Sequence, residues 1–498
     1  MSLIDQYPLT PEVKAFLARE GRLLIGDRWC SASDGGLLSV FDPSSGEMIA
    51  RVAAGTAADI DAAVNAATTA LPVWQALSPA DRASRMWELT RLIARDADHL
   101  AQLDTLNVGL PLEKTRHGEI PACIEDLQYY AGWATKLQGR TIPVGMPGFA
   151  VQTRREPMGV CGAITPWNYP MEAFSGKVGP ALACGNTLVL KPAEVSPLTA
   201  LWLGALALEA GIPAGVLNIV TGLGDVAGAA LAAHPGVAKI GFTGSTDVGR
   251  KLVVASAGNL KRISLELGGK SPNIIMADAD LEKAVAASAM AIHGHAGQNC
   301  IAGSRIFVQR AVHDQVVAAL TARTSELRVR TAFDPSVEIG PLVSARQRAR
   351  VAAYIEAGRA SGGEILCGGG VPAGVPETGF FMEPTLFAGV SESATLAREE
   401  IFGPVATIFA FDDLDEAIAR GNDTDYGLAA SIWTRDISTA NRFADRIQAG
   451  IVWINGHGIY DSAAPFGGYK QSGYGRDLGE ASLDEYTQVK TVWTAYDA

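Results

Sequence analysis

Alternation between two kinds of segment is the feature of this sequence that most restricts its fold. From Gly159 onward, short apolar segments typical of strands (GVCGAIT, NTLVLK, VLNIVTG and AKIGFTG) alternate with alanine-rich segments of helical character. This alternation predicts a parallel sheet covered by helices, because parallel strands need long crossover connections. We therefore expect an α/β fold, in which ligands bind at the carboxyl ends of the strands.

A second alternating series follows Cys300. Its expected strands include SRIFVQ, VATIFAF and YGLAASIWT, and its first helix lies around HDQVVAALTARTSEL. A chain of 498 residues is too long for one hydrophobic core, and 48% apolar with 19% charged residues is typical of a globular protein. We expect two α/β lobes, after an N-terminal part with short strands at LLIGDRWC and LLSVFDP and helices at DIDAAVNAATTALPVWQAL and ADRASRMWELTRLIARDADHLAQL.

Charge, apolar runs and cysteines restrict the partners and the compartment. The formal net charge of -12 disfavours nucleic acids and anionic membranes as partners. No apolar run reaches the roughly 18 residues of a membrane-spanning helix, and the N-terminus lacks the pattern of a signal peptide. The six cysteines are scattered without paired spacing, which favours a reducing cytoplasm over a disulfide framework or a zinc site.

Two glycine-rich turns run from an expected strand into an expected helix. In GLGDVA, Gly224 belongs to the loose dinucleotide pattern, in which backbone N–H groups at a helix N-terminus hold a pyrophosphate. In FTGSTDVG, Ser245 and Thr246 are placed to cap the helix. Gly244 and Gly249 let the backbone approach a ligand closely. Each turn alone is common in α/β proteins, but two on neighbouring strands favour a nucleotide site.

The acidic residue expected about 20 residues after such glycines is not evident. Instead, LKPAE places Lys191 and Glu194 at the end of an earlier strand, since Pro192 disfavours helix for the residue before it. A carboxylate at this edge can accept both hydroxyls of an adenosine ribose and would repel a 2'-phosphate. The residues therefore favour NAD over NADP.

Cys300 ends the segment HGHAGQNC, where three roles are open. Most cysteines are small buried apolar residues, and a metal site with His293 and His295 needs further ligands that are not obvious nearby. A nucleophile with a histidine base would make a thiol hydrolase. Glu266 in LELGGKSP and Asn168 in TPWNYP favour a catalytic site, although a capping or ion-pair carboxylate and an ordinary turn are the simpler alternatives.

Seven motifs in a fixed order make the chain resemble the aldehyde dehydrogenase superfamily: TPWNYP, LVLKPAE, FTGST, LELGGKSP, GQNC, EEIFGPV and PFGGYKQSGYGRDLG. They extend from residue 165 to 479, and the strands near residues 24 to 54 are similar to the family's N-terminus. The resemblance covers nearly the whole chain. It implies an aldehyde dehydrogenase-like α/β fold with a Rossmann-type NAD-binding domain, an α/β catalytic domain and a small β arm for oligomerisation.

By this resemblance, Cys300 is the nucleophile that attacks the aldehyde carbon. The Asn168 amide and the Cys300 backbone N–H hold the oxyanion. Loss of hydride to NAD gives a thioester, and Glu266 activates the water that hydrolyses it, a role that calls for a pKa raised by apolar surroundings. Relatives that pass the acyl group to coenzyme A generally lack this glutamate. The expected reaction is therefore NAD-dependent oxidation of an aldehyde to its free acid, without a metal.

The resemblance also implies which residues bind NAD. Lys191 and Glu194 match the residues that hold the adenosine ribose, and Ser245 lies at the pyrophosphate. Glu400 in EEIFGPV matches the residue that binds the nicotinamide ribose, whereas periodicity alone describes it as the start of a solvated helix. The full set expected at the cofactor is Thr165, Trp167, Lys191, Glu194, Gly224, Phe242, Gly244, Ser245, Leu267, Gly268, Glu400 and Phe402.

The expected substrate pocket departs from the family's pattern. Many members carry a bulky aromatic residue at the position of Gly176, and aromatic residues are frequent where this chain has HGH before GQNC. We therefore expect a widened pocket for a bulky, aromatic or extended aldehyde. Glu172 either meets a cation or hydroxyl of the substrate or forms a structural ion pair. The expected pocket residues are Tyr169, Glu172, Gly176, His293, Gly294, Asn299, Ile301 and Phe466.

The segments RTIPVGMPGFAVQTRR and EYTQVKTVW resemble the family's oligomerisation elements, which implies a homodimer or homotetramer. The arm they form interrupts the NAD-binding domain. The expected boundaries are residues 1–136 and 156–266 for the NAD-binding domain, 267–464 for the catalytic domain, and 137–155 and 480–498 for the arm.

Two alternatives stay open. An NADP-preferring or coenzyme A-acylating enzyme is opposed by Glu194 and Glu266, respectively. A catalytically silent, crystallin-like binding protein is opposed by the intact set of Cys300, Glu266 and Asn168.

Overall fold

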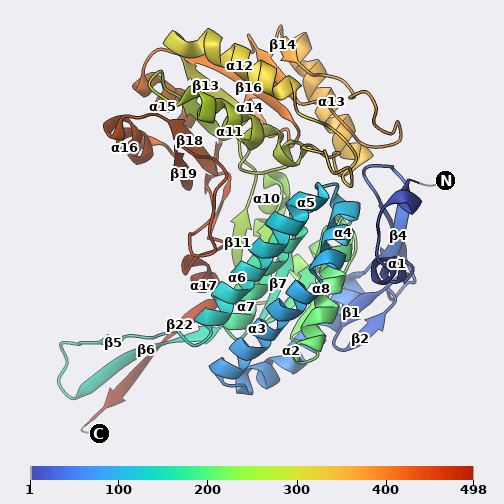
Figure 1. The fold of residues 1–498 in the computed structure, drawn as a ribbon. Helices are drawn as coiled ribbons and strands as arrows, with labels where there is room; N and C mark the ends of the chain where they lie inside the picture. The colour runs from blue at the N-terminus through green and yellow to red at the C-terminus, as the bar shows by residue number, and fades with distance from the viewer. Residues whose placement is uncertain (1–2, 497–498) are drawn as a thin grey trace.

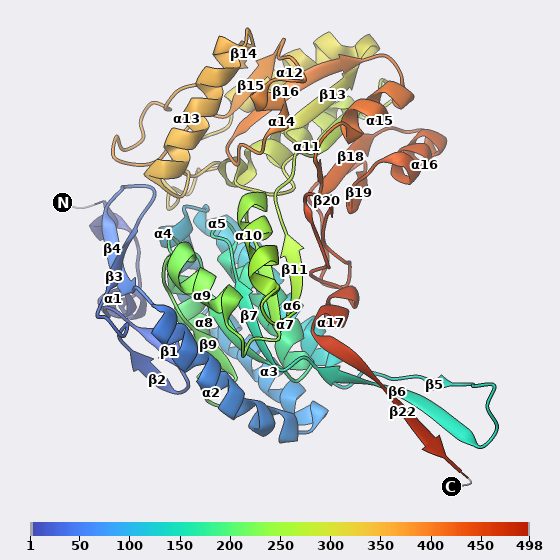
Figure 2. The ribbon, with the colours of Figure 1, turned by 180° about the vertical axis from the view of Figure 1, so that it is seen from behind.

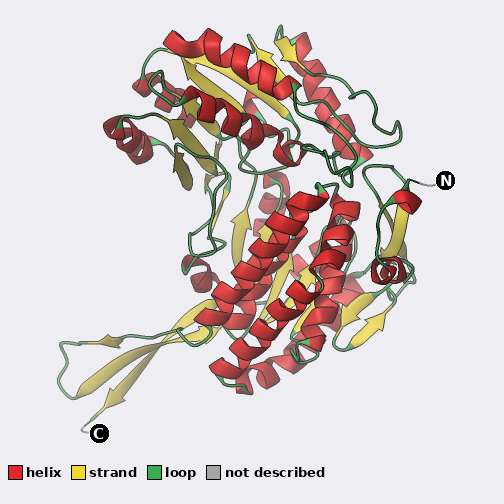
Figure 3. Cartoon of the chain, in the orientation of Figure 1, coloured by secondary structure: helices red, strands yellow, loops and turns green. Residues whose placement is uncertain are grey.

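The computed structural model describes residues 3–496, so the first two and last two residues of the expected domains lie outside the described part. Two lobes stand one above the other, and a narrow arm projects from the lower lobe (Figure 1). Strands run through each lobe with helices around them (Figure 3). The prediction of an α/β fold with two lobes is confirmed.

The lower lobe is built on an eight-stranded sheet in the order β2-β1-β9-β8-β7-β10-β11-β21. Its inner strands, from β9 to β11, are parallel. β1 and β21 pair antiparallel with β9 and β11, respectively, and β2 pairs antiparallel with β1. The inner strands are continuous apolar runs because helices cover both faces. The bounds are β1 (Leu23–Ile25), β2 (Arg28–Cys30), β7 (Val160–Ile164), β8 (Thr187–Lys191), β9 (Leu217–Ile219), β10 (Lys239–Thr243), β11 (Arg262–Glu266) and β21 (Gly473–Tyr474).

Helices α3, α4, α6, α7 and α8 pack on one face of this sheet, with Leu127 and Phe174 in their shared core. Helices α2, α9 and α10 pack on the other face, around Val64 and Leu252 (Figure 2). The bounds are α1 (Pro11–Leu17), α2 (Ala57–Ala76), α3 (Pro79–Arg95), α4 (Ala97–Val108), α5 (Leu112–Lys114), α6 (Ile120–Trp133), α7 (Pro170–Ala183), α8 (Leu198–Glu209), α9 (Ala229–Ala233), α10 (Thr246–Ser256) and α17 (Ala481–Glu485), beside a hairpin of β3 (Leu37–Phe41) and β4 (Met48–Ala53).

One stretch predicted as a single helix, ADRASRMWELTRLIARDADHLAQL, forms two helices, α3 and α4, that meet at Asp96. α3 begins after Ser78, whose hydroxyl accepts a hydrogen bond from the Asp81 N–H at 3.1 Å. It ends at Asp96, which is 7% exposed and accepts a hydrogen bond from Trp202 Nε1 on α8 at 2.9 Å. This contact joins residues far apart in the sequence, so helical periodicity could not locate the break.

The upper lobe is built on a seven-stranded sheet in the order β14-β15-β16-β13-β12-β18-β19. Only the β14–β15 pair in this sheet is antiparallel. The bounds are β12 (Pro272–Ile275), β13 (Arg305–Gln309), β14 (Glu364–Cys367), β15 (Thr385–Ala388), β16 (Val405–Phe411), β18 (Ala429–Trp433) and β19 (Ile451–Ile454), with α11 (Leu281–His293), α12 (His313–Ser325), α13 (Ala345–Ala360), α14 (Thr395–Arg398), α15 (Leu414–Asn422) and α16 (Ile437–Arg446) around them.

The arm is a three-stranded antiparallel sheet in the order β22-β6-β5. β22 (Thr487–Ala495) pairs along its whole length with β6 (Phe149–Pro157), and β5 (Thr141–Ile142) continues the sheet. Val489 and Trp493 on this arm are 68% and 52% exposed. Exposed apolar side chains on a protruding sheet are typical of a surface that contacts another protein.

The strand order places a topological switch point in the lower lobe. From β7 the chain moves to β8 and β9 on one side, then returns to β10 and β11 on the other. Connections leave β7 and β10 in opposite directions, which opens a crevice at their carboxyl ends. The chain enters the upper lobe directly after β11, so both lobes border this crevice.

No helix within residues 3–496 is long and apolar enough to cross a membrane.

Candidate active site

The chain reaches Cys300 through a strained turn. After α11, His295 and Ala296 adopt left-handed φ values of 51° and 53°. Such conformations cost residues with side chains about 1 kcal/mol or more each. Gly297 follows with φ of 71°, and a Cβ there would overlap the Gly403 carbonyl. The packing of the upper lobe therefore holds this turn, which presents Cys300 just before β13.

The Cys300 thiol lies among groups that oppose its ionisation. Its Sγ is 3.9 Å from Asn299 Oδ1. Burial raises the pKa of the thiol well above its usual range, and the carboxyls of Glu400 and Glu266 raise it further. The backbone N–H groups of Cys300 and Ile301 oppose this rise. Burial and the two carboxyls therefore favour the neutral thiol, whereas the two backbone N–H groups favour the thiolate.

Asn168 is held beside the cysteine loop by a contact between the lobes. It lies in the turn between β7 and α7, is 6% exposed, and its Nδ2 donates to the Gln298 carbonyl at 2.9 Å. Gln298 is itself fixed, because its Oε1 accepts a hydrogen bond from the Val343 N–H at 2.8 Å. The Asn168 amide carries two hydrogens, and the Gln298 carbonyl takes one. The other can be donated to a ligand.

Glu266 ends β11 and is 3% exposed, yet neither carboxyl oxygen has a hydrogen-bond partner among residues 3–496. Burial raises its pKa well above the usual value, and Asp477 adds to the rise, whereas Lys177 and Arg476 oppose it. The carboxyl acts in turn on the Cys300 thiol. Neither a helix cap nor an ion pair describes this side chain. Its surroundings are those of a general base.

A buried ion pair lies within electrostatic reach of Glu266. Lys177 on α7 is 1% exposed, and its Nζ contacts Asp477 Oδ2 at 2.6 Å and Oδ1 at 2.9 Å. The stem of Lys177 runs beneath Gly241 of β10, where a Cβ would lie 3.3 Å from the lysine Cδ. The lack of a side chain at Gly241 therefore leaves room for Lys177 to reach Asp477.

No histidine ring in the described part of the chain hydrogen bonds to Cys300. His293 is fully buried, with Nε2 3.5 Å from Thr324 Oγ1 on α12. His295 packs against Tyr169, with ring centroids 5.0 Å apart. Burial lowers the pKa of both imidazoles to about 3, so both are neutral. The geometry gives no support to a Cys–His thiol hydrolase, and no group of three His, Cys, Asp or Glu side chains between residues 3 and 496 is placed to hold a metal ion.

The carboxyl edge of the lower sheet carries the side chains expected at an adenosine ribose. Lys191 ends β8, and its Nζ contacts Glu194 Oε2 at 3.0 Å. Burial acts to raise the pKa of Glu194, but the charge and hydrogen bond of Lys191 outweigh it and lower the pKa. The Thr165 N–H donates to the Lys191 carbonyl at 3.1 Å, which ties the TPWNYP turn to this edge. An ionised carboxylate here can accept hydroxyl groups and repels a phosphate.

Of the two predicted caps in FTGSTDVG, only Ser245 fills the role. Its hydroxyl accepts a hydrogen bond at 3.4 Å from the N–H three residues later, at the start of α10. Thr246 is the first helical residue, and its hydroxyl donates to the Gln471 carbonyl at 3.3 Å. Gly244 lies against the Phe242 ring, 2.5 Å from the position of a Cβ. The turn therefore needs a glycine at this point.

The GLGDVA turn differs from the α-helix start expected there. Gly224–Gly228 forms a π-helical turn, which leads into the short α9. Within residues 3–496, no atom would lie within 4 Å of a Cβ on Gly224. π-Helical turns are frequent at functional sites.

Glu400 lies against the glycines that follow β11. Its Oε1 accepts a hydrogen bond from the Gly269 N–H at 3.1 Å, and a Cβ on Gly268 would overlap its carboxyl. Burial raises the pKa of Glu400 to about 7, although the Gly269 N–H and the charge of Arg350 oppose the rise. The carboxyl is thus near its point of half-ionisation beside Cys300.

Two predicted cofactor residues meet across the lobes. Phe402 has a left-handed φ of 57°, and its ring meets Trp167 edge-on with centroids 5.1 Å apart. Leu267 packs its side chain beneath Gly249 of α10, which brings this helix close to the end of β11.

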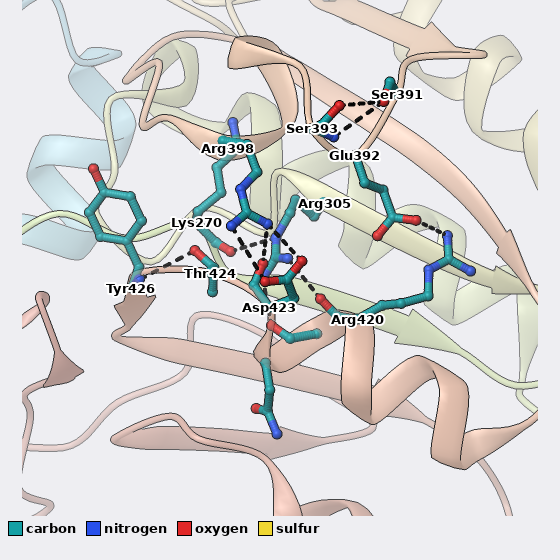
Figure 4. A network of polar contacts seen from close by, with 12 residues as sticks. Lys270, Arg305, Ser391, Glu392, Ser393, Arg398, Arg420, Asp423, Thr424 and Tyr426 are labelled. Carbon is teal, nitrogen blue, oxygen red and sulfur yellow. Dashed lines mark hydrogen bonds and ion pairs between the residues drawn. The ribbon is translucent and has the colours of Figure 1, made fainter.

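A polar network anchors the segment that precedes Glu400 (Figure 4). Arg398 on α14 pairs with Asp423 at 2.9 Å, and Arg420 on α15 pairs with Glu392 at 2.6 Å. These contacts fasten the segment to α15, so the position of Glu400 depends on the packing of the upper lobe. Figure 4 also shows Lys270, Arg305, Ser391, Ser393, Thr424 and Tyr426 in this network.

The substrate side of the site has an open space where the sequence predicts one. Gly176 on α7 is buried, and no atom of residues 3–496 would come within 4 Å of a Cβ there. Glu172 lies one turn earlier on the same helix face. The Tyr460 hydroxyl donates a hydrogen bond to Glu172 Oε1. Within residues 3–496, Glu172 forms no ion pair with lysine or arginine, so the alternative of a structural ion pair is wrong.

Of the other expected pocket residues, some lie beside Cys300, whereas those at the end of α11 do not. Ile301 is 3% exposed and packs with Phe466 in a small apolar cluster beside Cys300. Asn299 Oδ1 accepts a hydrogen bond from the Ile301 N–H at 3.2 Å. Gly294 follows α11 as its C-cap, and the ring of the preceding histidine turns toward α12 rather than toward this cluster.

A cavity of about 460 Å³ lies elsewhere, between α1, β4, α3 and α8. Phe16, Trp29, Arg51 and Trp202 line part of it. None of the residues predicted for catalysis, cofactor or substrate borders this cavity, so it is separate from the site around Cys300.

Comparison with known proteins decides the family. The model of the aldehyde dehydrogenase family matches residues 29–492. The chain belongs to the aldehyde dehydrogenase family. Retinal dehydrogenase 2 of Homo sapiens is 45% identical over 95% of this chain and 91% of its own length. Mitochondrial aldehyde dehydrogenase of Rattus norvegicus is 46% identical over 95% of this chain and 91% of its own length. The NAD+ complex of aldehyde dehydrogenase from Bacillus cereus has a TM-score of 0.96 at 44% identity, covering 98% of this chain and 99% of that one.

The aldehyde dehydrogenase resemblance predicted from seven motifs is therefore confirmed, together with the fold class.

Some residues of this site were not predicted from the sequence. Lys177 had a weak signal, as a lone lysine in the apolar segment PMEAFSGKVGPALA, and Asp477 lies within the last motif. Glu119 and Tyr460 carried no local signal, because only the fold brings them next to Glu172.

Proposed function

We propose that this member of the aldehyde dehydrogenase family oxidises an aldehyde to its carboxylic acid with NAD, using Cys300, Asn168 and Glu266. The observation that supports this most directly is a convergence. The Asn168 amide follows β7, the Glu266 carboxyl ends β11, and both approach the loop that carries Cys300. A thiol, an oxyanion donor and an unpartnered buried carboxyl are the parts that acyl chemistry on sulfur requires.

In the first half of the reaction, Cys300 Sγ bonds to the aldehyde carbon and the thiol proton is released to solvent. The negative oxygen that results is stabilised by the second hydrogen of the Asn168 amide and by the Cys300 backbone N–H. Each such donor contributes about 100- to 1,000-fold to the rate. NAD, when bound, accepts the hydride that the carbon loses, which leaves a thioester on Cys300.

In the second half, Glu266 takes a proton from a water molecule, whose oxygen bonds to the thioester carbon. The carbon–sulfur bond then breaks, the acid leaves, and the sulfur departs as a thiolate. Burial raises the pKa of Glu266 well above its usual value, which makes the carboxylate a stronger base than one in solvent. The nearby charges of Lys177 and Arg476 oppose this rise, although Asp477 adds to it.

The residues at the sheet edge fit NAD. Lys191 and Glu194 would hold the adenosine ribose, the N-terminus of α10 with Ser245 the pyrophosphate, and Glu400 the nicotinamide ribose. The lowered pKa of Glu194 supports NAD over NADP, because an ionised carboxylate accepts ribose hydroxyls and repels a 2'-phosphate. We also propose contacts from the remaining predicted cofactor residues, among them Trp167 and Phe402.

We propose a bulky, aromatic or extended aldehyde as substrate. The open space at Gly176 supports this, because a side chain there would occupy the path along α7. His295, which packs on Tyr169, replaces His293 in the proposed pocket.

We further propose that two or four copies of the chain assemble through the arm of residues 137–155 and 480–498. The exposed apolar side chains of β22 support such a contact. We also propose the remaining boundaries, 1–136 with 156–266 and 267–464, and the separation of the strands into two sheets supports them.

The test is formation of NADH from NAD over aldehydes from small aliphatic to bulky aromatic, without coenzyme A. Turnover is expected, with larger kcat/KM for the bulkier aldehydes. Cys300→Ala should lose more than about 1,000-fold of the rate in folded protein. If the unmodified protein forms no NADH with any aldehyde of the panel, a catalytically silent binding protein is favoured. A strict need for coenzyme A would favour acyl transfer.

A further inference from the structure

Four acidic side chains gather beside the proposed substrate pocket. Asp104 lies on α4, Glu119 in the π-helical turn Thr115–Glu119, Asp126 on α6 and Glu172 on α7. Glu172 acts electrostatically on Asp104 and Glu119, and Asp126 acts on Glu172. Like charges at such short range repel, so this gathering costs free energy unless something compensates it.

Glu119 is the member of this cluster whose closest neighbours are the Glu172 carboxyl and the Met171 N–H, with no cation among them. It is 2% exposed, and neither of its carboxyl oxygens has a hydrogen-bond partner in the described part of the chain. Its carboxyl faces that of Glu172. Asp104 is fully buried and has one oxygen without a partner, whereas Asp126 accepts hydrogen bonds from two serine hydroxyls. A buried polar group without a partner usually marks a site for something else.

The fold supplies no cation to these acids. The groups that act on Glu172 and Glu119 within residues 3–496 are carboxyls, the Tyr460 hydroxyl and a backbone N–H. Lys177 is paired with Asp477, and Lys114 Nζ donates to the Glu338 carbonyl at 3.1 Å. Buried carboxylates are normally matched by a positive charge. The fold thus supplies no positive charge to these carboxyls when they ionise, and a bound cation can supply it.

The acids lie where a substrate can reach them. The Tyr169 ring packs against His295 of the cysteine turn with centroids 5.0 Å apart, and its hydroxyl is close enough to Glu172, Glu119 and Cys300 for all three to act on it. Glu172 shares a helix face with Gly176, where the open space begins. A molecule whose aldehyde lies at Cys300 can extend past Tyr169 through this space.

We propose that Glu172 and Glu119 form a subsite for a protonated amine, so that the preferred aldehydes carry an ammonium group at the end remote from the carbonyl. This inference rests on the proposed dehydrogenase function and names the substrate class of the same site. An ammonium group donates to both carboxyls at once, which relieves their repulsion and satisfies Glu119.

The subsite has a pH signature. Burial raises the pKa of Glu172 and of Asp104 to about 7 and that of Glu119 well above its usual value. Asp104, Asp126, Tyr169 and Tyr460 also face these carboxyls, and none of them is a cation. Below this range the acids are neutral and attract an ammonium group weakly. As pH rises through about 7, Glu172 and Asp104 ionise, so the preference for an amine grows until the amine loses its own proton near about pH 10.

The experiment compares kcat/KM for 3-aminopropanal, butanal and 3-hydroxypropanal from about pH 6 to pH 9, with saturating NAD. A charge-assisted hydrogen bond predicts a preference for 3-aminopropanal over butanal of about 10- to 100-fold at about pH 8. Glu172→Gln should reduce this ratio by about tenfold or more and flatten its pH dependence. Glu119→Gln should act in the same direction. Glu125→Gln on the exposed face of α6 is the matched control and should leave the ratio unchanged.

Each outcome decides one proposal. Turnover of butanal with a ratio near one at every pH would overturn the subsite and leave the dehydrogenase intact. A preference for 3-hydroxypropanal would also overturn it, in favour of neutral acids that bind a hydroxyl. If folded protein oxidises none of the three aldehydes, the proposed function falls. Calorimetry with propylammonium then tests the subsite without turnover: binding that Glu172→Gln abolishes supports it, and no binding overturns it.

Discussion

Glu266 and Glu119 are two buried carboxyls of the same chain, and neither has a hydrogen-bond partner among residues 3–496. Burial is the main cause that raises the pKa of both. Their neighbours differ. At Glu266 the Asp477 carboxylate adds to the rise, but Lys177 and Arg476 oppose it, whereas the charged groups that face Glu119 are all carboxyls that add to it.

This difference shows that burial alone does not decide what a carboxyl can do. The charges of Lys177 and Arg476 favour the ionised form of Glu266, which a base must adopt in every cycle. Glu119 has no such cation, so its charge becomes favourable only when a ligand brings one. The surroundings of Glu266 suit the proton transfer that we propose for it, and those of Glu119 suit the proposed recognition of a cation.

Replacement of the base should have the largest effect. Glu266→Gln keeps the shape of the side chain and removes its basicity, so steady-state NADH formation should fall about 100- to 10,000-fold. A single burst of NADH should remain, because the thioester can still form. Rapid mixing with NAD and aldehyde measures both phases.

Glu399→Gln is the control, since Glu399 is exposed and accepts a hydrogen bond from the Tyr354 hydroxyl at 2.7 Å. It should turn over normally. Full steady-state activity in Glu266→Gln would show that the two carboxyls do not differ in the way described.

Removal of the cation beside the base should have an intermediate effect. Lys177 lowers the pKa of Glu266, so Lys177→Met should raise that pKa further. The base is active when ionised, so activity should fall at neutral pH and the acid limb of the pH profile should move to higher pH, by about tenfold in rate for each pKa unit. Profiles of kcat against pH for both proteins measure the shift.

The double variant Lys177→Met/Asp477→Asn is the matched control, because it removes both charges of the buried pair. Its acid limb should lie closer to that of the unmodified protein than the limb of the single variant does. An acid limb that does not move in Lys177→Met would mean that this lysine does not tune Glu266.

Removal of the unmatched acid should have the smallest effect, on stability. The folded protein holds the Glu119 proton above pH 4.5, where the unfolded chain releases it, so this group lowers stability as pH rises through that interval. Glu119→Gln removes this loss of stability, because glutamine does not ionise. Its Tm should exceed that of the unmodified protein by roughly 1 to 3 °C at about pH 8 and match it at about pH 5.

Differential scanning calorimetry at the two pH values makes this comparison. Glu125→Gln again serves as control and should show no difference between them. A Tm gain in Glu119→Gln that is equal at both pH values would indicate a packing effect and not an electrostatic one.

The amino-acid sequence predicted the alternating strands, the two lobes and the family, since these depend on local patterns and ordered motifs. It also identified Cys300, Glu266 and Asn168 as candidates. It did not predict the break at Asp96 or the π-helical turn at Gly224–Gly228, because packing between distant segments decides both.

In the proposed substrate pocket, too, the sequence predicted one feature and missed another. Gly176 marked the open space, because the absence of a side chain is a local fact. The sequence selected His293, but the strained turn at His295 and Ala296 aims the next histidine at Tyr169 instead. Backbone conformations of this kind are imposed by the surrounding lobe and leave no trace in residue spacing.

By itself, the sequence determined which chemical groups are present and which strand or turn carries each of them. Only the tertiary structure decided which charges face one another: Lys177 meets Asp477 across 300 residues, and Tyr460 meets Glu172 across 288. The reason is physical. The ionisation of a buried group depends on charges within a few ångströms of it, and the fold, not the order of residues, sets those distances.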